Sequence, residues 1–184
     1  MLCDKCLLLI DNNLPDKTRQ ILHRLHNSEI TVNHLAQETG QSAHEIRKRL
    51  LYLKGATLVW GDWSAYSISP AGERMIELLT KPTGSPAKNL CDTCLLQIGE
   101  TLPPRESDIL GVFSTRPLTR LQIVVATGLS DHKVREGLIL LRGARLVEAR
   151  SGGRAFYLTA EGRRLEHLWR QQLAGSREMM PVTA

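Results

Sequence analysis

Aromatic side chains are scarce in this sequence: Phe, Trp and Tyr make up 4% of its 184 residues. Proteins that bind single-stranded nucleic acid without sequence preference stack the bases on aromatic side chains. A chain with so few of them is poorly suited to that role.

Long apolar runs are also missing. No segment approaches the roughly 20 apolar residues of a membrane span, and residues 1–10 lack the basic start and long apolar core of a signal peptide. We therefore expect a cytoplasmic protein that does not contact membranes. In that compartment the four cysteines are not expected to form lasting disulfides.

The common catalytic motifs are absent as well. The sequence has no glycine-rich phosphate loop, no GxSxG, no HExxH and no close acidic pair of the kind that general acid–base chemistry uses. We expect that the chain is not an enzyme and has no catalytic residues.

The charge balance favours an anionic partner. Lys and Arg total 24 against 19 Asp and Glu, which gives a net charge of +5 and an isoelectric point near 9.2. Such a balance is typical of proteins that bind nucleic acid but does not prove it.

The sequence repeats itself. A shift of 88 positions aligns residues 3–64 with residues 91–152 without a gap, with 22 identities in 62 positions. LCDKCLL returns as LCDTCLL, and LKGATLV returns as LRGARLV. A period this long predicts two copies of one domain, not a solenoid of short repeats.

One stretch of each copy organises the rest: SAHEIRKRLLYLKGATL from Ser42 and SDHKVREGLILLRGARL from Ser130. Each predicts a capped helix followed at once by a strand, with Glu45 placed to complete a capping box in the first copy. Gly55 and Gly143 are expected to end the helices in a left-handed conformation. Apolar residues at helical spacing predict one buried face, and cations occupy the opposite face.

The remaining pattern predicts a mainly α fold with small β-wings, in the α+β class, built from two tandem domains. Within each copy a short apolar helix is followed by two further helices, the organising helix, a two-stranded hairpin and a closing helix. This order, and passages such as SISPAGERMIELL and YLTAEGRRLEHLW, resemble the winged helix-turn-helix regulators of bacteria. The expected boundaries are a first domain at 1–80, a linker at 81–89, a second domain at 90–174 and a disordered tail at 175–184.

The resemblance implies that the organising helices read duplex DNA in the major groove. Arg47 and Arg135 occupy equivalent positions and can bond a guanine edge, while Lys48 and Lys133 suit phosphates. The full set of expected DNA contacts on the two helices is Ser42, His44, Arg47, Lys48, Ser130, His132, Lys133 and Arg135. The two serines can equally serve as helix caps alone.

The two hairpins differ in chemistry. Arg150 and Arg154 flank a flexible, basic tip in the second copy that suits a phosphate or minor-groove contact. The first copy has Trp60 and Trp63 instead, and we expect these to contact a protein partner or a second copy of the chain. Packing on the domain's own core is the alternative.

The cysteines form two CxxC pairs, Cys3 with Cys6 and Cys91 with Cys94. Two such pairs at equivalent positions can converge between the domains into one tetrahedral zinc site. Buried thiols that act as small apolar side chains, or a redox pair, remain alternatives.

Three functional hypotheses follow. The leading one is a sequence-specific, duplex-DNA-binding transcriptional regulator in which one chain acts as a pseudo-dimer, with its two reading helices about 34 Å apart to match one turn of DNA. The second is a tandem winged-helix adaptor that docks on protein, similar to the accessory subunits of chromosome-condensing complexes. The third, a plasmid or phage replication initiator, shares the DNA-binding chemistry of the first.

Overall fold

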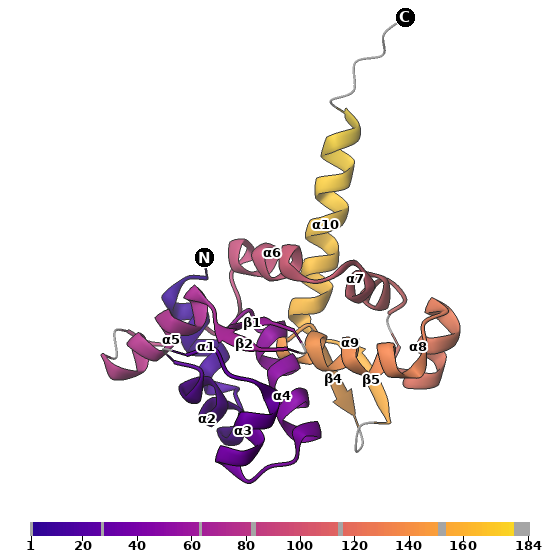
Figure 1. Ribbon diagram of the computed structural model, residues 1–184. Helices are drawn as coiled ribbons and strands as arrows, with labels where there is room; N and C mark the ends of the chain where they lie inside the picture. Colours follow the sequence, from indigo (N-terminus) through magenta and orange to yellow (C-terminus); the bar gives the residue numbers. More distant parts are fainter. Residues whose placement is uncertain are drawn as a thin grey trace, which may run out of the picture.

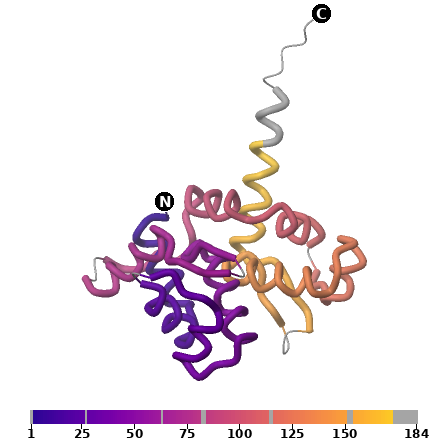
Figure 2. Tube along the Cα trace, in the orientation of Figure 1, coloured from indigo at the N-terminus to yellow at the C-terminus, as the bar shows by residue number. Residues whose placement is uncertain are grey.

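The computed structural model describes residues 2–26, 28–62, 64–81, 84–113, 116–150 and 154–178. It is mainly helical with two small antiparallel sheets, so the predicted α+β class is confirmed. The first and second halves of the chain lie side by side, and the last helix projects away from both (Figures 1 and 2). Among the described helices, none combines the length and apolar character needed to cross a membrane.

The first half places four helices before a hairpin and one helix after it. Its elements are α1 (Asp4–Asn12), α2 (Asp16–Arg24), α3 (Val32–Thr39), α4 (Ala43–Gly55), β1 (Val59–Gly61), β2 (Tyr66–Ile68) and α5 (Pro70–Thr80). The hairpin pairs Val59 with Ile68 and Gly61 with Tyr66.

The second half repeats this order with one added strand. Its elements are α6 (Asp92–Thr101), α7 (Pro104–Gly111), β3 (Leu118–Thr119), α8 (Arg120–Thr127), α9 (Asp131–Gly143), β4 (Val147–Arg150), β5 (Ala155–Leu158) and α10 (Ala160–Glu178). The strand β3 pairs with β5, so the second sheet has the order β3-β5-β4. At the matching place in the first half there is only an isolated bridge between Ile30 and Tyr66.

Local signals in the sequence explain where α4 and α9 begin. The hydroxyl of Ser42 accepts from the backbone N–H of Glu45, and that of Ser130 accepts from the N–H of Lys133. Each cap satisfies one N–H group that would otherwise lack a partner. Both halves of a capping box are present elsewhere, at Thr119 and Gln122.

The predicted left-handed glycines at the ends of α4 and α9 are wrong. Gly55 and Gly143 are the last residues inside the two helices, and the positive φ angles, both 62°, belong to Thr57 and Arg145 two residues later. Thr57 and Arg145 adopt this uncommon conformation in tight turns, in which Leu58 donates to the carbonyl of Leu53 in the first half. The reason for the two glycines lies in the contact between the helices, described below.

The core follows the predicted helical faces. Ile46, Leu50 and Leu53 of α4 have no exposed surface, and Val134 and Leu141 of α9 have none either. The buried apolar residues of both halves form one continuous cluster. The two halves therefore pack on each other and share apolar surface.

The connection between the halves contacts the first half, and the last helix runs beyond its expected end. The backbone N–H of Ala87 donates to the carbonyl of Lys5 over 3.1 Å, so the connection contacts the first half there, whereas the carbonyl of the buried Leu90 accepts from Arg164 of α10. The helix α10 runs on to Glu178, so the expectation of a disordered tail is wrong for residues 175–178. Residues 179–184 lie outside the described part of the chain.

Candidate metal centre and paired-helix surface

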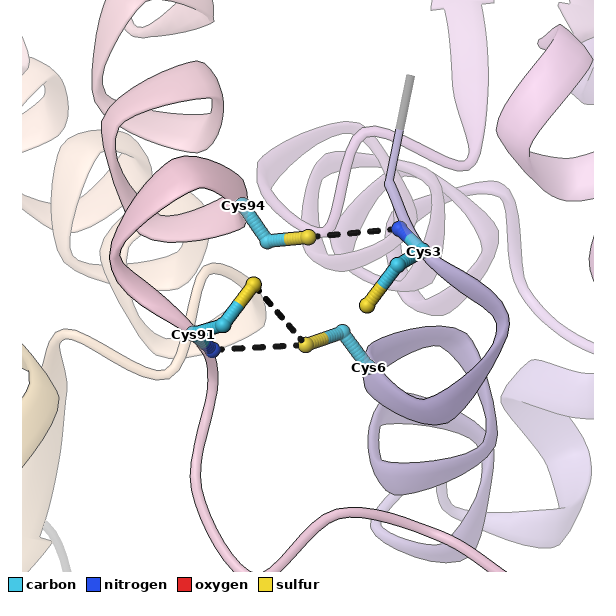
Figure 3. A group of neighbouring side chains, drawn as sticks. All are labelled: Cys3, Cys6, Cys91 and Cys94. Atoms are coloured by element: carbon cyan, nitrogen blue, oxygen red, sulfur yellow. Dashed lines mark hydrogen bonds between the residues drawn. The ribbon is translucent and has the colours of Figure 1, made fainter. Parts of the chain in front are cut away.

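The four cysteines meet at one point, although the two pairs are far apart in the sequence (Figure 3). Cys3 and Cys91 are the residues that precede α1 and α6, and Cys6 and Cys94 lie in the first turns of those helices. All four Sγ atoms lie within 4.8 Å of one another. Cys3 and Cys91 are exposed, whereas Cys6 and Cys94 are buried.

Reciprocal hydrogen bonds join the two pairs. The backbone N–H of Cys3 donates to Sγ of Cys94 over 3.2 Å, and that of Cys91 donates to Sγ of Cys6 over 3.4 Å. Both bonds run from one half of the chain to the other, as Figure 3 shows. An N–H group pointed at sulfur favours the thiolate, which is the form that binds metal.

The distances fit a four-coordinate metal. A tetrahedral site with metal–sulfur bonds of about 2.3 Å has sulfur atoms about 3.8 Å apart. The Sγ atoms of Cys6 and Cys91 are separated by 3.8 Å. The N-termini of α1 and α6 both face the cluster, and their dipoles favour negative charge there. The donor set and its spacing are therefore compatible with a metal site.

Burial controls the protonation of the thiols. It raises the pKa of Cys6 to about 11 and also raises the pKa of Cys94. Burial acts in the same direction on Cys91, but hydrogen bonds from the backbone and side chain of Cys94 and from the Cys6 thiol outweigh it and lower the pKa. Binding of a divalent cation to all four sulfurs would displace protons from the buried thiols.

Equivalent ion pairs fasten both cysteine-bearing helices. Arg74 of α5 contacts Asp4 over 2.8 Å, and Arg164 of α10 contacts Asp92 over 2.7 Å. Asp4 and Asp92 directly follow Cys3 and Cys91, so the pairs hold the starts of α1 and α6 in place.

The second candidate site is formed by α4 and α9, which pack directly against each other. A Cβ atom added to Gly55 would lie 1.9 Å from the carbonyl oxygen of Leu140, and one added to Gly143 would lie 1.9 Å from that of Tyr52. These contacts are reciprocal, because each glycine meets the helix that carries the other. Only glycine permits so close an approach of two backbones.

Between the N-terminal halves of the two helices lies a cavity of about 250 Å³. It is lined by equivalent residues from the two helices, four from each: His44, Arg47, Lys48 and Leu51, and His132, Arg135, Glu136 and Ile139. The structure thus brings five of the predicted DNA contacts together around one opening.

Arg135 and His44 link the two helices across this cavity. The guanidinium of Arg135 is hydrogen-bonded to Nε2 of His44 at 3.1 Å. Both residues are exposed, as are Arg47, Lys48 and His132. Their charged or polar groups are therefore accessible to a partner.

The other predicted contacts lie outside the cavity. Ser42 and Ser130 act as helix caps, and Lys133 is exposed on α9. In the second hairpin Arg154 is exposed and Arg150 lies over the Tyr157 ring, 4.8 Å from its centroid. This contact orients the Arg150 guanidinium while leaving the residue exposed.

The expected separation of about 34 Å between the two helices is wrong. Each helix has 13 residues and is therefore about 20 Å long. Helices of this length that touch at Gly55 and Gly143 cannot have centres 34 Å apart. The physical cause is the inter-helix contact, which a local sequence pattern does not reveal.

Sequence reasoning also missed exposed apolar residues on α8. Leu121 and Val125 are 70% and 77% exposed, one helical turn apart. Trp60 in the first hairpin, which the sequence did predict as a protein contact, is 59% exposed. The signal was available: the equivalents of Leu121 and Val125 in the first half are the polar Asn33 and Gln37. Trp63, the other predicted protein contact, lies outside the described residues.

Comparison of the sequence with models of protein families gives no match, and comparison with curated proteins gives none either. Functional inference therefore depends on the geometry and chemistry of the two sites.

Proposed function

We propose that the chain binds duplex DNA through α4 and α9 as a winged-helix transcriptional regulator, with zinc bound by its four cysteines. The observation that carries the proposal is the gathering of Arg47, Lys48 and Arg135, with His44 and His132, around one exposed opening formed by two helices. Cations concentrated on adjoining helix faces match the phosphate and base-edge chemistry of a major groove.

Contact between the helices determines what length of DNA they would read. Their combined reach is about the 20 Å length of one helix, which corresponds to about six base pairs at 3.4 Å per pair. We therefore expect one short, continuous recognition element in place of two half-sites one turn apart. Lys48 and its equivalent Glu136 differ in charge, so the element is expected to be an imperfect palindrome.

Zinc would act structurally in this proposal. Cys3, Cys6, Cys91 and Cys94 supply four thiolates, which complete a tetrahedral shell and leave no position for a substrate or water. The metal would cross-link the starts of α1 and α6 and so hold the two halves together.

A salt-titrated binding assay on duplex fragments tests the DNA proposal. We expect affinity to fall steeply with salt, and Arg47→Ala and Arg135→Ala each to reduce discrimination among sequences by about 1–3 kcal/mol. Arg170→Ala is the matched control, because it removes the same charge from the exposed face of α10. Unchanged sequence preference in both variants would rule out α4 and α9 as the reading elements.

The exposed Trp60, Leu121 and Val125 favour a second candidate, a protein-docking adaptor. Exposed large apolar side chains are frequent at protein contacts. Absence of DNA binding at low salt, together with self-association that Trp60→Ser abolishes in sedimentation, would favour the adaptor over the regulator.

A further inference from the structure

The cavity between α4 and α9 combines cationic walls with an apolar floor. We propose that it binds a small organic acid, a carboxylate joined to an apolar body, and that the bound acid excludes DNA from the same helices. The exclusion of DNA rests on the proposed DNA-binding function, whereas the binding of the acid does not.

The size of the cavity limits the ligand. At about 250 Å³ it falls just below the usual range of about 300–1,000 Å³ for sites that hold drug-sized molecules. A compact acid fits within this volume, whereas a nucleotide or a lipid would extend beyond it.

The charges of the walls favour an anion. Arg47, Lys48 and Arg135 contribute three cations, and Glu136 is the one acidic residue in the lining. The Glu136 side chain is only 13% exposed and has two basic neighbours: Arg105 of α7 at 3.7 Å and the His132 ring at 3.6 Å. Arg105 is also bonded to the buried Glu106 carboxylate at 2.6 Å, so it does not neutralise Glu136, but the three cations of the lining still outnumber its one acid.

Arginine geometry favours a carboxylate among anions. A guanidinium carries five N–H donors in a fixed plane and binds carboxylates through two parallel hydrogen bonds. The bond between Arg135 and His44 uses one of these donors and holds the group beside the opening. Arg47 is the equivalent residue on α4 and lines the opposite wall.

The floor explains why the acid needs an apolar body. Leu51 and Ile139, one from each helix, are partly buried and line the cavity. An aliphatic or aromatic group placed on them would displace water from apolar surface, which is favourable. Inorganic phosphate, or a phosphate of a DNA backbone, gains nothing from that contact.

Binding of the acid would be coupled to DNA binding. Arg47 and Arg135 cannot bond a carboxylate and a guanine edge at once. For exclusive binding, acid at ten times its dissociation constant weakens the apparent DNA affinity by about tenfold. The acid would then act as an inducer that releases the protein from DNA.

Calorimetry on the full chain without DNA tests the site directly. The probes are benzoate and hexanoate, the neutral amides of the same shape, benzamide and hexanamide, and inorganic phosphate as a bare anion. We expect at least one carboxylate to bind at least tenfold more tightly than its amide and than phosphate. Arg47→Gln and Arg135→Gln should each weaken it at least tenfold, as expected for loss of a charged hydrogen bond, whereas the control Arg170→Gln should not.

Several results would overturn the site: no binding of either carboxylate, equal binding of the amides or of phosphate, or unchanged affinity in both cavity variants. DNA affinity is measured separately, with and without the acid. If the acid binds but DNA does not, the proposed function fails and the acid site stands. If DNA binds and the acid does not, the acid site fails and the proposed function stands. If both bind without competing, the exclusion step is wrong.

Discussion

Gly55 and Gly143 sit where α4 and α9 touch, and an added methyl group at either position would reach a carbonyl oxygen of the facing helix. The contact is reciprocal: the absence of a side chain at Gly55 lets α9 approach α4, and its absence at Gly143 lets α4 approach α9. Gly111 at the end of α7 offers a comparison, because a Cβ added there meets nothing within 4 Å.

We expect Gly143→Ala to lower the free energy of unfolding by about 1–3 kcal/mol, because overpacking forces the helices apart. Gly111→Ala should leave stability unchanged or raise it by up to about 1 kcal/mol, since alanine favours the helix. Urea denaturation monitored by circular dichroism measures both. Equal stabilisation in the two variants would show that the helices adjust to the methyl group without cost.

At the scale of the element, local signals in the sequence predicted where α4 and α9 begin, at the caps Ser42 and Ser130. Gly40 and Gly128, in the turns before α4 and α9, have positive φ angles of 64° and 69°, which glycine adopts readily. One residue in each half could not be assigned in the same way: Thr57 and Arg145 adopt left-handed conformations that their side chains do not signal.

The packing of α4 against α9 was not predictable from the pattern of either helix. Periodicity identifies the face that is buried within a domain, but Leu51 and Ile139 are only partly buried and line a cavity between the halves. The convergence of the cysteines could be proposed because equivalent segments meet in a twofold arrangement. The arrangement that brings them together depends on long-range contacts.

The second hairpin yields a prediction of its own. Arg150 and Arg154 are exposed near the hairpin tip, and neither lines the cavity. Arg150→Ser with Arg154→Ser should weaken DNA binding on every sequence alike and flatten the salt dependence by about one to two units of slope. The measurement is fluorescence anisotropy over a salt series, with Arg170→Ser as the control. A sequence-dependent loss would instead mean that the hairpin reads bases.

At the scale of the whole molecule, the cysteine cluster and the contact between α4 and α9 both join the two halves. A metal at the cluster would stabilise only the joined, folded state. Free zinc at about 1,000 times its dissociation constant would add about 4 kcal/mol, or about 10 °C in Tm for a chain of this size.

Elemental analysis should find one zinc per chain, and a chelator should lower Tm by about 10 °C. Cys3→Ser with Cys91→Ser should abolish the zinc-dependent part of Tm, and because both residues are exposed the change leaves the core packing intact. Two metals per chain, or one metal shared by two chains, would contradict a single site between the halves. No metal, with a disulfide found by mass spectrometry, would favour a redox pair.

The residues Lys48 and Glu136 occupy equivalent positions on opposite walls of the cavity. A homodimer would have to place the same residue on both walls, so its two ends would be interchangeable. Here a single chain carries both walls, and the difference of two charge units gives the opening a polarity. An elongated molecule with unequal charge at its two ends therefore binds across the opening in one preferred orientation. Each end of that molecule then contacts a different side of the protein.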